Sequence, residues 1–151
     1  MTATQDSTNQ ILVIIAGGVG AAIGIYFLVE FAVETHERFR LWNMARDAAD
    51  RRKKPLLVVG SPGMYLVDSY PHGDVTIDID PKDARTQKVD VLEASKTFAP
   101  KQFGASFISH VVEHVTDPEK ALAELYAVSD EVFVARPWGL MSWLPPEHRW
   151  L

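Results

Sequence analysis

The chain has 151 residues, a net charge of −5 and no cysteine. Such a mild charge argues against nucleic acid as a general partner, and the lack of cysteine excludes disulfides and thiolate metal sites. Once the apolar N-terminal region is set aside, the remaining length is enough for one small domain.

The N-terminal region is the first predicted element. Residues 11–29 carry no charge, and 31–33 continue the apolar run past Glu30. A helix needs roughly 20 apolar residues to cross the ~30 Å hydrocarbon layer of a bilayer. The sequence therefore predicts an N-terminal tail over 1–10 and one transmembrane helix over 11–33.

Two other interpretations of this region stay open. A cleaved signal peptide needs a basic start and a shorter apolar core, whereas the residues before Ile11 include Asp6 and no Lys or Arg. A dinucleotide-binding turn could begin with the Gly-Val-Gly of 18–20, but Ile23 stands where the G-x-G-x-x-G pattern has its third glycine. A membrane span is favoured over both.

The charges that flank the span predict its orientation. No basic residue precedes it, whereas Arg38, Arg40 and a basic cluster at 51–54 follow it. Basic flanks stay on the cytoplasmic side of a membrane. The expected topology is therefore single-pass, with the N-terminus outside and the C-terminal domain in the cytoplasm.

Small residues stand at helical spacing within the span, namely Gly17, Gly20, Ala21 and Gly24. Such residues let two helix backbones approach closely in lipid. They favour a homodimer or docking on a membrane-protein partner, although glycine is also common in spans that pack on nothing.

Residues 34–54 are expected to form a basic helical stalk between the span and the domain. Opposite charges stand four residues apart, as in a helix, at Glu34/Arg38, Asp47/Arg51 and Asp50/Lys54. The basic cluster is interpreted either as a contact with anionic lipid or as a solvated helix face. Pro55 then ends the helix and begins the globular part.

The region 55–151 has an α/β pattern. Short runs typical of parallel strands occur at 56–59, 75–81, 88–91, 105–109 and 131–135. Asp117 and Pro118 suit the start of a helix, and its apolar face is formed by Ala121, Leu122, Leu125 and Val128. Strands that alternate with helices or turns predict a doubly wound α/β sheet of about five parallel strands, with a ligand crevice at their carboxyl ends.

One stretch of this region resembles a known family. The string at 103–122, FGASFISHVVEHVTDPEKAL, resembles the fourth strand, loop and following helix of class I S-adenosylmethionine-dependent methyltransferases of the small-molecule type. The resemblance implies a reduced Rossmann-like sheet and S-adenosylmethionine as the possible cofactor. It assigns Asp78 to the ribose hydroxyls, Asp90 to the adenine amino group and the turn of Gly60 and Gly63 to the methionine part, with Ser109 at the same edge.

The chain also departs from the family pattern. Val58 stands where an acid is usual, Pro62 and Met64 stand where glycines are usual, and the sequence ends before a sixth and a seventh strand. These departures favour a catalytically degenerate domain, a pseudoenzyme that serves as an accessory or structural subunit of a membrane complex. The alternative is an active methyltransferase that acts on a lipophilic or membrane-associated acceptor, with His110 as the catalytic base.

His110, Glu113 and His114 also match two metal-binding patterns. H-x-x-E-H is the inverted zinc-protease signature, but that signature lies within a helix and these residues follow a strand. This loop also resembles that of ubiquinone-pathway O-methyltransferases, which hold a divalent metal with an E-x-x-E-H set. In this chain His110 stands in place of the first carboxylate of that set. Backbone hydrogen bonding within the loop is the favoured interpretation, and no metal is expected.

The C-terminal residues are rich in aromatic side chains, with Trp138, Trp143, Trp150 and His148. In an enzyme they would line an acceptor pocket. In a structural protein they would form a docking surface, which is the favoured interpretation.

Overall fold

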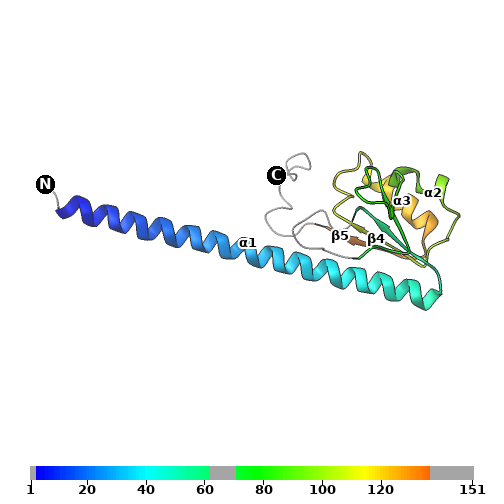
Figure 1. Cartoon of the computed structure of the whole chain (residues 1–151), viewed down its shortest axis with the longest axis horizontal. Coiled ribbons are helices and arrows are strands. Elements are labelled where there is room, and N and C mark those ends of the chain that lie inside the picture. The colour runs from blue at the N-terminus through cyan, green and yellow to red at the C-terminus, as the bar shows by residue number, and fades with distance from the viewer. Residues whose placement is uncertain (1–2, 62–70, 137–151) are drawn as a thin grey trace. The chain divides into compact units, whose positions relative to one another are not determined.

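The computed structural model of the chain describes residues 3–61 and 71–136, with side chains described from Ile15 onward. The described elements, in chain order, are α1 (Ala3–Arg52), β1 (Leu56–Val59), β2 (Val75–Asp78), β3 (Thr86–Lys88), the 3-10 helix η1 (Val91–Glu93), α2 (Ala94–Thr97), β4 (Ala105–Ser109), α3 (Pro118–Val128) and β5 (Val132–Ala135). Figure 1 shows their arrangement.

The chain divides by its internal contacts into Met1–Glu34 and Thr35–Leu151. In the first unit, the described part of α1 exposes large apolar side chains such as Ile15, Ile25 and Leu28. α1 is the one helix of the described residues that is long and apolar enough to cross a membrane, and this stretch lies near the N-terminus. That much of the transmembrane prediction is confirmed.

The second unit contains a five-stranded sheet with all strands parallel, in the order β3-β2-β1-β4-β5. The centre of the sheet is buried on both faces, and every residue of β1 and β4 is buried. This burial explains why β1 reads as a continuous apolar run instead of an alternating one. The α/β class and the parallel sheet expected from the sequence are confirmed.

The first face of the sheet is covered by η1, α2 and α3, which pack around Leu57, Ile77 and Ile108. α3 begins where its sequence predicts, because the Asp117 carboxylate accepts a hydrogen bond of 2.9 Å from the Lys120 amide. The residues of α3 that turn fully inward are Ala121, Leu125 and Val128.

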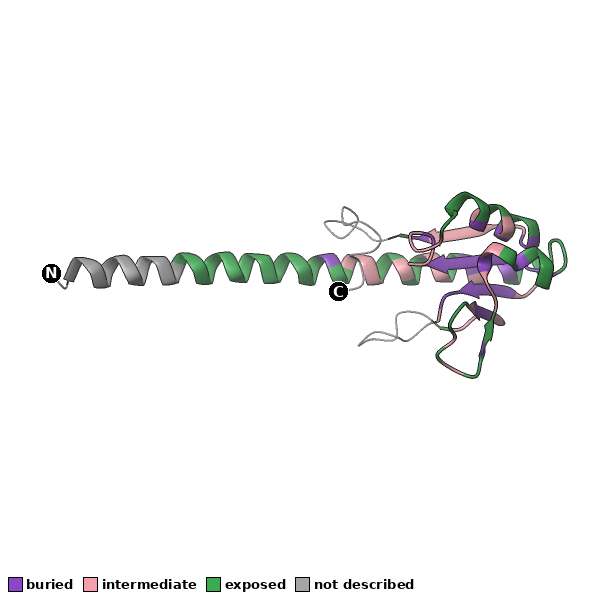
Figure 2. Cartoon of the chain, turned by 90° about the horizontal axis from the view of Figure 1, so that it is seen from above, coloured by how far each residue is buried: buried purple, intermediate pink, exposed green. Residues whose placement is uncertain are grey.

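The second face is covered by the C-terminal part of α1. Ala45, Ala48 and Ala49 are fully buried against a set of strand residues, and Figure 2 shows the C-terminal part of α1 running alongside the strands. The packed residues of the strands are Leu56, Val58, Ala105, Phe107 and Ala135. The segment expected as a stalk is therefore a layer of the α/β domain. Its charges dominate the sequence pattern, whereas its small alanines make the contact.

The packing of this helix also changes the ion pairs that were expected along it. α1 ends at Arg52, so Lys54 lies beyond the helix and pairs with Asp130 at 2.7 Å instead of with Asp50. Asp50 pairs with Arg46, which also reaches Asp74 at 2.6 Å. The expected Asp50/Lys54 pair is thus wrong, because long-range partners compete with neighbours along the helix.

The strand bounds differ from the predicted ones at the edge of the sheet. β3 covers Thr86–Lys88 instead of 88–91, because the Asp90 side chain accepts a hydrogen bond from the Leu92 amide and starts η1. η1 and α2 were not predicted. Both are too short for a helical repeat to be recognised in the sequence.

Candidate ligand-binding site

A cavity of about 460 Å³ opens at the carboxyl ends of the strands. The strand order reverses at β1, so the loops after β1 and β4 leave in opposite directions and open a crevice there. The volume lies within the ~300–1,000 Å³ usual for small-molecule sites. Predicted site residues on the cavity wall are Gly60, Asp78, Asp90, Ser109 and His110.

Asp78 joins the turn after β1 to the end of β2. Its two carboxylate oxygens accept hydrogen bonds from the amides of Ser61, at 2.7 Å, and Asp80, at 2.8 Å. Gly60 has a φ of 99°, a conformation that favours glycine, and its amide donates to the Ile77 carbonyl at 2.8 Å. The turn therefore presents backbone and carboxylate together at the cavity.

Asp90 follows β3 on the same side of the cavity. Its Oδ1 accepts the Leu92 amide at 2.9 Å, and the preceding Val89 amide donates to the Asp78 carbonyl at 3.0 Å. Asp78 and Asp90 thus lie on neighbouring strands and offer carboxylate acceptors to the hydroxyl or amino groups of a ligand. Asp80 beside them is ion-paired with Lys82, whose hydrogen bond and charge lower the pKa of the Asp80 carboxyl.

Two buried hydroxyl groups of the cavity wall, on Ser61 and Ser109, have no hydrogen-bond partner among the residues that the structure describes. Ser109 is only 4% exposed. A buried polar group without a partner costs about 1–3 kcal/mol. Such groups at a cavity wall are suited to bind a polar ligand.

His110 has a φ of 54°, and its amide donates to the Ala135 carbonyl at 3.2 Å. Its Nε2 lies 2.9 Å from Nη2 of Arg38, and its Nδ1 lies 3.7 Å from Oε1 of Glu113. Arginine only donates hydrogen bonds, so Nε2 is the acceptor and the ring proton of the neutral form is on Nδ1, toward Glu113. The ring atom that would accept a substrate proton is therefore engaged by a cation.

Arg38 is a cavity residue that sequence reasoning did not place at the site. It belongs to α1 yet lines the cavity of the α/β domain. Its sequence context differs little from that of Arg40, which pairs with Glu37 on the exposed helix surface. The only feature of the sequence that could have indicated this position is the helical periodicity, which places Arg38 on the same side of α1 as the buried alanines.

Several residues that the sequence analysis singled out cannot be placed at this site. Gly63 lies outside the described residues, and so do Trp138, Trp143, Trp150 and His148 of the aromatic C-terminal segment. Within the part of the chain that is described, no group of three or more His, Cys, Asp or Glu side chains is placed to hold a metal.

Comparisons with protein-family models, with curated protein sequences and with solved structures find no match to this chain. The geometry of the cavity is therefore the main guide to a function.

Proposed function

We propose that this chain is a membrane-anchored domain with a reduced Rossmann-like fold that binds S-adenosylmethionine, as class I methyltransferases do. The observation that carries the proposal is the pair of carboxylates, Asp78 and Asp90, beside the Gly60 turn on one wall of the 460 Å³ cavity. The cavity that they line also includes the carboxyl ends of β1 and β4, where the strand order reverses and where doubly wound sheets bind nucleotides.

The residues of the cavity suit the groups of that cofactor. Asp78 would accept the ribose hydroxyls, and Asp90 would accept the adenine amino group. Apolar side chains beside them would cover the adenine ring, among them Ile79, which is 64% exposed at the cavity. The buried hydroxyls of Ser61 and Ser109 would gain partners. Bound there, the cofactor would supply an activated methyl group.

The anchor suggests which acceptor such a domain would serve. Arg38 lines the cavity, and the chain from residue 33 to residue 38 spans at most about 18 Å when fully extended. A lipophilic or membrane-associated acceptor fits this constraint.

A second candidate function is that of an accessory or structural subunit, without catalysis, in a membrane complex. Two observations favour it. Nε2 of His110, the expected base, accepts a hydrogen bond from Arg38. The glycines of the apolar helix, Gly17, Gly20 and Gly24, have no described atom within 4 Å of an added Cβ, so this face has room for a partner helix.

The test of the first function is calorimetric titration of the full chain, in mild detergent, with S-adenosylmethionine and S-adenosylhomocysteine. We expect binding that Asp78→Asn weakens at least ~10-fold, equal to a loss of about 1.4 kcal/mol. Asp117→Asn is the matched control, since asparagine caps a helix as well as aspartate does and this position lies outside the cavity. Absence of heat and of thermal stabilisation at millimolar ligand would refute the proposal.

The second function is tested by the mass of the particle extracted from its native membrane in mild detergent. An accessory subunit should travel with a larger complex, and Gly20→Leu should release it by filling the open helix face. A monomer that transfers methyl groups to a lipid-soluble acceptor would contradict this function and support the enzyme.

A further inference from the structure

The cavity carries opposite charges on its two sides. Asp78 ends β2 and Asp90 follows β3, whereas Arg38 lies against His110, which follows β4. β1 separates β2 from β4, and neighbouring strands are about 4.8 Å apart, so the cation lies on the order of 10 Å from the nearer carboxylate. A ligand that spans the cavity meets acceptors at one end and a cation at the other.

Arg38 is well suited to hold an anionic group at its end of the cavity. Its guanidinium is always charged and presents several N–H donors in a planar fork that matches a carboxylate. The hydrogen bond of 2.9 Å to Nε2 of His110 orients it. The buried Ser109 hydroxyl, one residue before His110, adds a donor at the same strand end.

We propose that Arg38 binds the carboxylate of the ligand, so that this cavity selects a nucleoside that carries an amino-acid group over the nucleoside alone. The inference rests on the proposed binding of an S-adenosyl compound. Arg38 lies outside the region 55–151, in which the family resemblance was found. The contact of Arg38 with the carboxylate would also compensate for the turn after β1. There Pro62 and Met64 stand in place of glycines whose backbone would approach that end of the cofactor.

The experiment compares two ligands on the full chain in detergent. S-Adenosylhomocysteine and 5′-methylthioadenosine share the adenosine and the sulfur, but only the former has the carboxylate and the amine. We expect the wild-type chain to bind S-adenosylhomocysteine at least ~10-fold more tightly. Arg38→Gln, which keeps a donor toward His110 and removes the charge, should reduce that preference to less than ~3-fold and leave 5′-methylthioadenosine binding unchanged.

Arg40→Met is the matched control, because Arg40 lies half a turn further along α1, is exposed and does not line the cavity. It should keep the full ligand preference. Thermal denaturation checks that each variant folds, and Arg38→Met provides a second neutral variant if Arg38→Gln does not.

The outcomes separate the two proposals. If the wild type binds neither ligand, the proposed function fails. Equal binding of both ligands by the wild type, or a preference that survives in Arg38→Gln or Arg38→Met, overturns the role of Arg38 and leaves the proposed function standing.

Discussion

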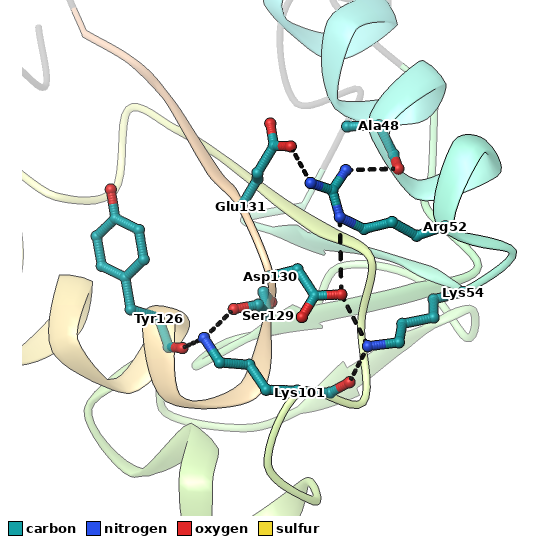
Figure 3. Close-up of polar contacts among 8 residues, drawn as sticks. All are labelled: Ala48, Arg52, Lys54, Lys101, Tyr126, Ser129, Asp130 and Glu131. Carbon is teal, nitrogen blue, oxygen red and sulfur yellow. Dashed lines mark hydrogen bonds and ion pairs between the residues drawn. The ribbon is translucent and has the colours of Figure 1, made fainter.

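The two edges of the sheet differ in how their serine hydroxyls and lysine side chains are paired. At the amino edge, where the strands begin, polar groups are paired with one another. Figure 3 shows residues at the end of α1 in contact with the turns before β4 and β5. At the carboxyl edge, Ser61 and Ser109 keep buried hydroxyls without a partner among the described residues.

The amino edge is a connected network of cations and acceptors. Lys54 donates to the Asp130 carboxylate at 2.7 Å and to the Lys101 carbonyl at 3.0 Å. Lys101 donates to the Ser129 carbonyl at 2.8 Å, and Arg52 pairs with Asp130 and Glu131. These contacts connect the end of α1 to the segment between α3 and β5.

The proposed binding of a ligand at the carboxyl edge would explain this difference, because Ser61 and Ser109 line the cavity there. Buried polar groups in proteins are almost always paired, so unpaired ones gathered at a cavity indicate a place where a ligand completes the hydrogen bonds. Substitutions at the two edges test this contrast.

Adding a methyl group at the amino edge should strongly destabilise the domain. An added Cβ at Gly104 would lie 2.8 Å from the Ala49 Cα and 3.1 Å from the Lys54 Cβ, so α1 would have to move off the sheet. We expect Gly104→Ala to cost about 2–3 kcal/mol, measured by chemical denaturation of the full chain in detergent. Gly24→Ala, where an added Cβ meets no described atom within 4 Å, is the control and should leave the domain's stability unchanged.

Two serines of β4 offer a direct comparison of the edges. Ser106 is buried and hydrogen-bonded to the Ser129 hydroxyl, whereas Ser109 is buried with its hydroxyl unpaired among the described residues. Ser106→Ala should cost about 1–2 kcal/mol, because it leaves Ser129 without this partner, and Ser109→Ala should cost about zero while weakening ligand binding. Equal losses of stability in denaturation experiments would contradict the contrast.

The smallest expected effect is a dependence of stability on acid at the amino edge. The Lys54 hydrogen bond lowers the pKa of Asp130 below its ordinary value of 3.8, and burial, which acts the other way, does not cancel this. The pair therefore stabilises the fold above about pH 4, and this contribution is lost as the pH falls through the lowered pKa of the folded state.

Asp130→Asn should lower the melting temperature at neutral pH by a few degrees at most, because the pair is partly exposed. Near pH 3 the difference from the wild type should shrink. Melting curves at both pH values check this, and a difference that grows in acid would show that another group is responsible.

Much of the fold follows from local patterns in the sequence. The apolar helix, the strands β1 and β4 and the start of α3 are predictable, because a long uncharged run, a buried apolar run and an N-cap followed by proline each depend on neighbouring residues. One rule, that parallel strands end at one edge of a sheet, explains why the same cavity is lined by Gly60, Asp78, Asp90, Ser109 and His110.

The sequence by itself therefore determined the class of the fold, the apolar segment and the edge of the sheet at which the candidate site residues lie. Only the tertiary structure decided that the end of α1 covers a face of the sheet, that Arg38 enters the cavity and that Lys54 pairs with Asp130. The physical reason is the range of the interactions. Periodicity and capping act between near neighbours, whereas these contacts join residues far apart in the chain, and their partners are set by packing.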